Sequence, residues 1–208
     1  RLIENEANMI ASLFPKGLRD LEAGAVAEVV NQAGLSACNA VIREGFWTPE
    51  DRLGATLPGF VKTMRAAGLS VPMTETDWDP GQMVSMPDAA GAIEAIRGAG
   101  IDTIRLRQVN SGGKFGGVGD VDRELAETRE HFLKLAELAA EHEVRFVYQV
   151  HFKTLLASAS SLRPMLEGID PAHVGGMLDG CNMVIEGMED WRKSCRLIGK
   201  HLAAFGIK

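Results

Sequence analysis

The feature that most constrains this chain is an Ala-Gly pair that recurs where a helical pattern gives way to an apolar run. The pair ends at Gly34, Gly68 and Gly100, at intervals of about 33 residues. Glycine suits the left-handed backbone position that follows the last turn of a helix. Each pair precedes an apolar run of strand length. One helix and one strand per repeat predict a parallel βα fold.

Hydrophobic periodicity extends this pattern along the chain. Strands are predicted over residues 9–14, 35–42, 69–74, 101–109, 144–153, 174–178 and 202–208. Helices are predicted over residues 18–32, 57–66, 89–97, 121–143, 160–166 and 188–201. Because the connections of such units are right-handed, seven strands alternating with six helices indicate either a doubly wound sheet or a (β/α)8 barrel.

Polar side chains at nearly every predicted strand exit favour the barrel. These residues are Glu44, Glu75, Arg105, Arg107, Gln149, His151, Asp179, Asn182 and Lys208. In a (β/α)8 barrel, the C-terminal ends of all strands surround one mouth. We therefore expect an α/β fold of the TIM-barrel type, with residues 1–208 forming one domain. A complete barrel has eight strands in roughly 250 residues, so we expect the eighth strand and the last helices to lie outside this sequence.

The clearest predicted strand covers residues 144–153. Gln149, His151 and Lys153 alternate along its end, and in a strand this spacing places all three side chains on one face. Each polar residue also has a plain structural explanation. A histidine is often only a hydrogen-bonded core residue, Asp179 often only caps the following turn, and Arg107 often only pairs with a carboxylate. Their convergence on one mouth is what indicates a site.

Composition narrows the functional classes. The chain is 46% hydrophobic and 24% charged, as expected of a soluble globular protein. Its net charge of −6 argues against a nucleic-acid partner, and no apolar run approaches the roughly 18 residues of a membrane span. Three cysteines without metal-type spacing indicate reduced thiols and a cytoplasmic protein. The sequence leaves the oligomeric state open, a homo-oligomer included.

The glycine-rich stretch over residues 110–120 contains five glycines and one lysine. It matches neither the P-loop pattern nor the dinucleotide-binding fingerprint. We therefore predict a loop over the barrel mouth rather than a phosphate cradle.

Several stretches in the second half of the chain form a recognisable set. They are Tyr148-Gln149-Val150-His151, Ser158-Ala159-Ser160, Gly168-Ile169-Asp170-Pro171, the segment Leu-Asp-Gly-Cys-Asn-Met-Val-Ile-Glu-Gly over residues 178–187, and Ala204-Phe205-Gly206-Ile207-Lys208. Together they resemble the sugar phosphate isomerase/epimerase family, within the xylose isomerase-like barrel superfamily. The likeness is best from about residue 124 onward and is topological before that.

The resemblance implies a divalent metal at the mouth: manganese, zinc or magnesium. The family's usual ligands are a Glu ending the fifth strand, an Asp ending the sixth, a His in the seventh and a Glu in the eighth. Asp179 matches the Asp, whereas Gln149 stands at the position of the first Glu and Gly206 at that of the His. Gln offers a metal only a neutral carbonyl oxygen and cannot serve as a base. Asp179 and Gln149 are thus the only metal ligands that this comparison suggests.

The resemblance supports three hypotheses about function. The preferred one is an isomerase or epimerase that moves a proton on a small sugar, sugar phosphate or keto acid, with Glu75 or His151 as the catalytic base. The predicted substrate ligands are Glu44, Arg107, Gln149, Asn182 and Lys208. The second hypothesis is a binding or regulatory protein that kept the sugar pocket without the chemistry. The third is a lyase or dehydratase of a related polyol. The acidic chain disfavours endonuclease activity, which also occurs in this superfamily.

Overall fold

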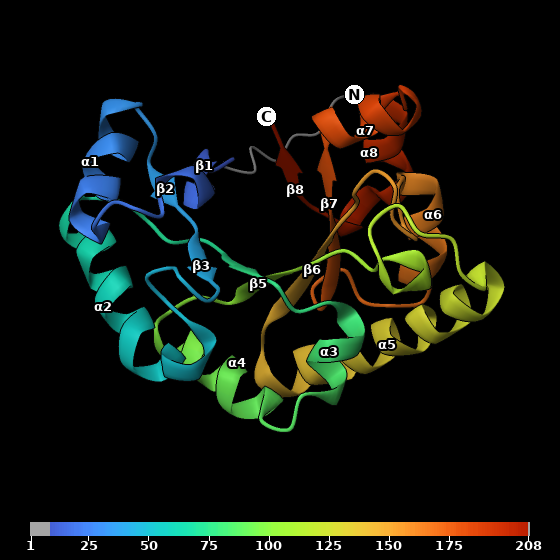
Figure 1. The fold of residues 1–208 in the computed structure, drawn as a ribbon, viewed down its shortest axis with the longest axis horizontal. Coiled ribbons are helices and arrows are strands. Elements are labelled where there is room, and N and C mark those ends of the chain that lie inside the picture. The colour runs from blue at the N-terminus through green and yellow to red at the C-terminus, as the bar shows by residue number, and fades with distance from the viewer. Residues whose placement is uncertain (1–8, 208) are drawn as a thin grey trace.

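The computed structural model describes residues 9–207, in which a curved parallel sheet is surrounded by helices (Figure 1). The strands are β1 (Ser12–Leu13), β2 (Ala37–Cys38), β3 (Ala40–Ile42), β4 (Thr74–Thr76), β5 (Thr103–Leu106), β6 (Arg145–Gln149), β7 (Val174–Asp179) and β8 (Leu202–Gly206). The α-helices are α1 (Ala23–Gln32), α2 (Leu53–Ala66), α3 (Pro80–Ser85), α4 (Ala89–Gly98), α5 (Val121–His142), α6 (Ala159–Leu166), α7 (Gly180–Gly187) and α8 (Trp191–Ile198). Short 3-10 helices cover Pro15–Leu18, Glu50–Arg52, Ser111–Gly113 and Gly199–His201.

The strands follow their order in the sequence around the barrel wall. β1 pairs with β2, and a second sheet runs in the order β3-β4-β5-β6-β7-β8, with every pairing parallel. Only Asn39 separates β2 from β3, and its backbone amide donates to the carbonyl of Leu13 at 2.9 Å. β2 and β3 are therefore two parts of one predicted strand, and the expected TIM-barrel architecture is confirmed. Within residues 9–207, β1 and β8 are the two ends of this wall, and no ladder joins them.

The repeated glycine junctions have the backbone conformation that the sequence predicts. Gly34, Gly68 and Gly100 have φ angles of +72°, +81° and +79° at the ends of α1, α2 and α4. After α2, the amide of Leu69 donates back to the carbonyl of Met64 at 3.0 Å. This long hydrogen bond closes a Schellman motif and turns the chain back toward the sheet.

Several predicted strand boundaries are wrong. The first strand is limited to Ser12–Leu13, and the one expected over residues 69–74 is Thr74–Thr76. The side chains of Leu69, Val71 and Met73 are buried although these residues precede the ladder of β4, so burial and ladder pairing do not coincide there. β6 ends at Gln149, and Lys153 has a φ of +58° in the turn that follows. His151 and Lys153 therefore do not share a strand face with Gln149.

Two short helices were not predicted from the sequence. α3 begins after Asp79 and α7 begins after Asp179, and each aspartate accepts a hydrogen bond from a backbone amide of the first helical turn. The last predicted helix, over residues 188–201, is shorter than expected, and its Trp191 is 57% exposed.

The apolar core lies between the sheet and the outer helices. Phe132, Leu135 and Ala139 on α5 are buried, and Phe132 packs against Tyr148 of β6 with ring centroids 5.5 Å apart. No helix in the described part of the chain is both long and apolar enough to cross a bilayer. The inner side of the barrel wall is different, because it carries buried polar side chains.

Candidate functional site

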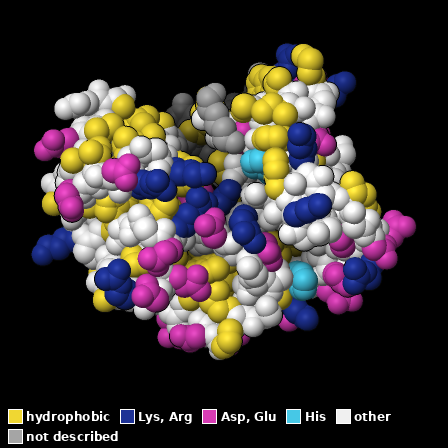
Figure 2. All heavy atoms as spheres, viewed as in Figure 1, with side chains coloured by type: hydrophobic (Ala, Val, Ile, Leu, Met, Phe, Trp, Pro, Cys, Tyr) yellow, Lys and Arg dark blue, Asp and Glu magenta, His cyan; other side chains and the backbone are white. Residues whose placement is uncertain are grey.

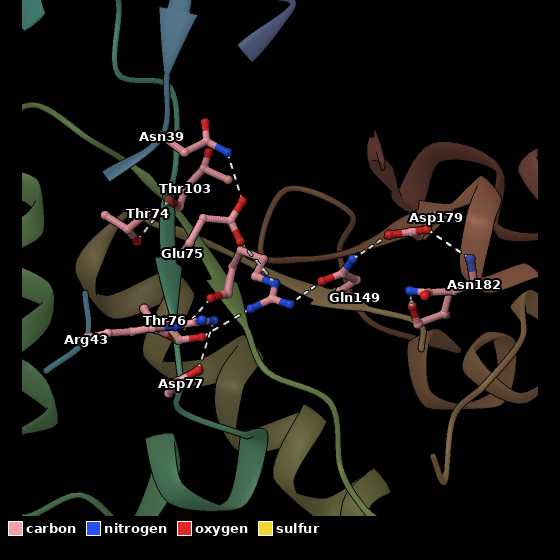
Figure 3. Close-up of polar contacts among 12 residues, drawn as sticks. Asn39, Arg43, Thr74, Glu75, Thr76, Asp77, Thr103, Gln149, Asp179 and Asn182 are labelled. Carbon is pink, nitrogen blue, oxygen red and sulfur yellow. Dashed lines mark hydrogen bonds and ion pairs between the residues drawn. The ribbon is translucent and has the colours of Figure 1, made fainter. Parts of the chain in front are cut away.

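A chain of polar contacts runs along the inside of the barrel from β1 to β7. Figure 3 shows its middle part, from Asn39 through Glu75 and Gln149 to Asp179. Each contributing side chain comes from a different strand or strand junction. The residues are Ser12, Asn39, Glu75, Arg105, Gln149 and Asp179. All except Ser12 are buried.

The first contacts of this chain lead to a buried carboxylate. The Ser12 hydroxyl donates to Asn39 Oδ1 at 2.6 Å, and Asn39 Nδ2 donates to Glu75 Oε1 at 2.8 Å. Asn39 lies at the junction between β2 and β3, which allows its side chain to contact both β1 and β4. Asn39 was not among the predicted site residues, although a single amide within the apolar run Ala-Cys-Asn-Ala-Val would have indicated it.

Glu75 and Arg105 form the central ion pair. Arg105 Nε lies 3.2 Å from Glu75 Oε2, and the side chains are only 6% and 2% exposed. Arg105 Nη1 donates to the carbonyl of Thr76 at 3.2 Å, and the Thr76 hydroxyl donates to the carbonyl of Arg105 at 2.9 Å. The parallel register places Glu75 beside Arg105, so the pairing of β4 with β5 positions both charges.

The amide of Gln149 bridges Arg105 and Asp179. Arg105 Nη2 donates to Gln149 Oε1, and Gln149 Nε2 donates to Asp179 Oδ2 at 3.0 Å. Because a guanidinium only donates and a carboxylate only accepts, these neighbours determine the orientation of the amide. The predicted metal ligands Gln149 and Asp179 are thus brought into direct contact.

Asp179 connects the polar chain to α7. Its Oδ1 accepts from the amide of Asn182 at 3.0 Å, and Asn182 Nδ2 donates to the carbonyl of Val150 at 3.2 Å. The expectation that Asp179 caps the following turn is therefore confirmed. The same carboxylate also faces Gln149, so capping and site formation share one side chain.

Burial changes the protonation behaviour of the central pair. Burial raises the pKa of Glu75 above its ordinary value, and the nearby Arg105, Asn39 and Arg43 oppose this effect only in part. Burial lowers the pKa of Arg105, against the influence of Glu75. Glu75 therefore keeps its proton to a higher pH than an exposed glutamate does, a property often found in acid–base catalysts.

A hollow of about 600 Å³ lies beside the polar chain on the outer part of the mouth. Its lining includes Lys16, Arg19, Arg43, Glu44, Phe46 and Asp77. Figure 2 shows Lys and Arg side chains gathered around the middle of this face. Arg43 Nη2 lies 2.9 Å from Asp77 Oδ1, so these two lining residues form an ion pair. Glu44 is the lining residue that the sequence predicted as a substrate ligand.

Two other predicted site residues lie away from the polar chain. Arg107 pairs with Asp79 at 3.2 Å near the start of α3, which matches its plain structural explanation. His151 lies in the turn after β6. Its ring stacks on the ring of Phe152, with centroids 4.7 Å apart, and meets the ring of Phe115 edge-on, with centroids 5.7 Å apart. Lys208 lies outside the described residues.

The glycine-rich loop closes over the turn that contains His151. The amide of Gly116 donates to the carbonyl of Lys153 at 3.0 Å. The Glu124 carboxylate at the start of α5 accepts from the Ser111 hydroxyl at 2.6 Å and from the amide of Gly112 at 2.9 Å. The stretch predicted as a mouth loop is therefore held by hydrogen bonds near its start and at its middle.

The donor set does not fit the divalent metal that the family resemblance implies. Gln149 Oε1 already accepts from a guanidinium, and Gly206 has no side chain to offer. Within residues 9–207, no three His, Cys, Asp or Glu side chains come together in a way that could hold a metal ion. Structural zinc sites use four protein ligands and catalytic sites three.

Comparison with known proteins agrees with the observed architecture. The family model for the xylose isomerase-like TIM barrel matches residues 43–208. No curated protein sequence matches the chain.

Among solved structures, one of D-psicose 3-epimerase in the presence of D-fructose has a TM-score of 0.71 at 16% identity and covers 96% of this chain and 73% of its own. The structure of the IolI protein with a bound zinc atom has a TM-score of 0.72 at 12% identity, covering 96% and 72%. A sugar phosphate isomerase/epimerase from Parabacteroides distasonis has a TM-score of 0.69 at 13% identity, covering 99% and 77%. Identities this low show a shared fold alone, but the family model spans most of the sequence. The chain therefore belongs to the xylose isomerase-like TIM barrel family.

Proposed function

We propose that this protein is an isomerase or epimerase that moves a proton on a small carbohydrate or keto acid at the C-terminal mouth of the barrel. The observation that carries this proposal is the buried Glu75 carboxyl, whose pKa is raised and which lies beside the Arg105 guanidinium. The proposal also draws support from solved structures of the same fold, which include a D-psicose 3-epimerase and a 3-keto-D-glucoside 4-epimerase.

The central pair has the two groups that such a reaction needs. Removal of a proton next to a carbonyl requires a base, and Glu75 is the proposed base. The reaction places negative charge on the substrate oxygen, and donors from Arg105 would stabilise that charge. Because Glu75 is 2% exposed, the surrounding side chains must move when a substrate enters.

The remaining predicted residues take supporting roles in this proposal. Glu44 in the hollow and Arg107 at the rim would bind substrate hydroxyls or oxyanions, and Asn182 and Gln149 would orient the inner end of the ligand. His151 is the second candidate base, and it would reach the substrate only after a movement of the turn that follows β6.

The proposed reaction can be tested by hydrogen exchange at carbon. The protein is incubated in deuterated water with ketoses, ketose phosphates and small keto acids, and NMR follows deuterium entering the carbon next to the carbonyl. Glu75→Gln should slow exchange by about 10²–10⁴-fold, because it removes the base. Glu137→Gln, an exposed change on α5, should leave the rate unchanged.

A binding protein is the second candidate. Asn39 contacts one carboxylate oxygen of Glu75 and Arg105 contacts the other, so both oxygens that a base would use already have partners within the protein. Ligand binding by calorimetry without any deuterium entry would favour that role. Loss of water from the ligand would instead indicate a dehydratase. Full exchange by Glu75→Gln would remove Glu75 as the base, and His151→Gln would then be the informative variant.

A further inference from the structure

The Arg105 guanidinium lies among oxygen atoms of the kinds that hard metal ions prefer. It contacts a Glu75 carboxylate oxygen at 3.2 Å, the backbone carbonyl of Thr76 at 3.2 Å and the side-chain carbonyl of Gln149. Carboxylate, backbone and amide oxygens are typical ligands of divalent cations. Here they converge instead on a planar cation supplied by β5, so the protein already contains a positive charge at this point.

The side chain at position 149 is matched to that cation. A glutamine can accept from Arg105 with one atom and donate to Asp179 with the other, as Gln149 does. A carboxylate at the same position would offer two acceptors and would repel Asp179. The neutral amide of Gln149 therefore bridges the Arg105 guanidinium and the Asp179 carboxylate without adding a charge of its own.

The residue at position 206 lies beside Asp179, the carboxylate that accepts from Gln149. Gly206 is paired with Asp179 in the β7–β8 ladder. A Cβ atom at this position would lie 3.2 Å from Asp179 Oδ2 and 2.9 Å from the Cε atom of Met177. A side chain at position 206 would thus face the Asp179 carboxylate. The family resemblance implies a histidine ligand at this position, and glycine provides no imidazole there.

We infer that Arg105 is the resident cation of this site and supplies the positive charge that a divalent metal would otherwise provide, that Gln149 is matched to this guanidinium, and that Gly206 withholds the side chain that a metal would need as a ligand. Only the role of Arg105 toward a substrate rests on the proposed function. A substrate carbonyl, carboxylate or enediolate oxygen would then meet hydrogen-bond donors of fixed planar geometry rather than an ion. The placement of the cation itself depends on the contacts above.

Metal uptake provides the first test. The wild-type chain and variants are dialysed against Mn²⁺ and, separately, Zn²⁺, and bound metal is measured by elemental analysis and by electron paramagnetic resonance for Mn²⁺. The wild type and Gln149→Glu/Gly206→His should retain no stoichiometric metal, because Arg105 remains. Adding Arg105→Ala to that pair should tighten Mn²⁺ binding by about tenfold or more.

Two outcomes of the metal experiment would overturn the inference. One is a wild-type protein that retains one equivalent of either metal. The other is a folded triple variant that binds Mn²⁺ no better than the wild type. Because Gly206→His crowds Met177, Arg105→Ala/Gln149→Glu is measured in parallel, and circular dichroism confirms the folding of each variant.

Chemical rescue gives a second and independent test. Arg105→Ala should lower the melting temperature by roughly 6 °C or more, because it leaves Glu75 without its buried partner. Millimolar guanidinium chloride should restore part of this loss, whereas equal concentrations of urea or sodium chloride should not. Arg97→Ala is the matched control, since Arg97 pairs with Glu143 at the surface. An equal response to urea, or rescue of the control, would contradict a specific cation site.

Neither experiment depends on turnover. If deuterium exchange fails while metal exclusion and guanidinium rescue succeed, the proposed reaction is wrong and the resident cation stands. If exchange succeeds but the wild type retains metal, the resident cation is wrong and the proposed reaction stands.

Discussion

Glu75 is an acidic side chain that is almost completely buried, with 2% of it exposed. Burial raises its pKa above the usual 4.5, despite the opposing effects of Arg105, Asn39 and Arg43. In the folded protein the group therefore holds its proton at pH values where the unfolded chain has released it. Its contribution to the free energy of unfolding is fully present below pH 4.5 and declines as the pH rises through the folded pKa.

This linkage predicts a pH-dependent effect of Glu75→Gln on stability. The variant cannot ionise at position 75, so the stability of the wild type relative to the variant should fall as the pH rises from about 4 toward 8. Urea denaturation across this range measures the difference. Parallel stability curves for the two proteins would show that the raised pKa is wrong.

Asp179 has two structural partners that substitutions can separate. Asp179→Ala should destabilise the fold by about 2–4 kcal/mol, because it removes the cap of α7 and leaves the Gln149 amide group without its acceptor. Asp179→Asn retains an acceptor oxygen for the Asn182 amide and should cost less. Urea denaturation compares the variants, and equal losses would show that the cap contributes little.

At the scale of secondary-structure elements, the glycine junctions explain why the helices end where they do. Each has a positive φ angle, which costs an L-residue with a side chain roughly 1–2 kcal/mol. Gly68 has open space around the position of a Cβ atom, so only the backbone conformation disfavours a side chain there. The signal is local, which is why the sequence alone was enough to find it.

Gly68→Ala should therefore destabilise the protein by about 1–2 kcal/mol. Gly59→Ala is the matched control, because Gly59 lies inside α2 and also has open space around its Cβ position. In that helical setting alanine should stabilise by up to about 1 kcal/mol. Chemical denaturation measures both, and effects of the same sign would contradict the role of the positive φ angle.

At the scale of the whole molecule, the strands differ in how many neighbours they have. β4, β5, β6 and β7 are each paired on both sides, whereas β1 has two residues and, within residues 9–207, pairs only with β2. Backbone amides of β6 should therefore exchange hydrogen for deuterium more slowly than those of β1. Mass spectrometry of proteolytic peptides measures the two rates. Equal protection of both strands would indicate that the sheet opens as one unit.

The elements predicted best are those with strong local signals. The long helix α5 and the glycine at the end of α2 depend on residues close in sequence, and both were predicted. Strand ends were predicted less well, because an apolar run reports burial and not ladder pairing. The strand expected over residues 144–153 shows this limit, since the turn at Lys153 separates His151 from Gln149.

The sequence by itself determined the alternation of helices and strands, because this alternation follows from hydrophobic periodicity. Right-handed connections left two architectures open, and the polar residues at the strand ends favoured the barrel, in which the strands follow their order in the chain. Only the tertiary structure decided which polar residues meet. Asn39, Glu75, Arg105 and Gln149 lie far apart in the chain, and strand register brings them into one buried chain of contacts. Register depends on packing across the whole barrel, and so does the choice of a guanidinium as the cation at its centre.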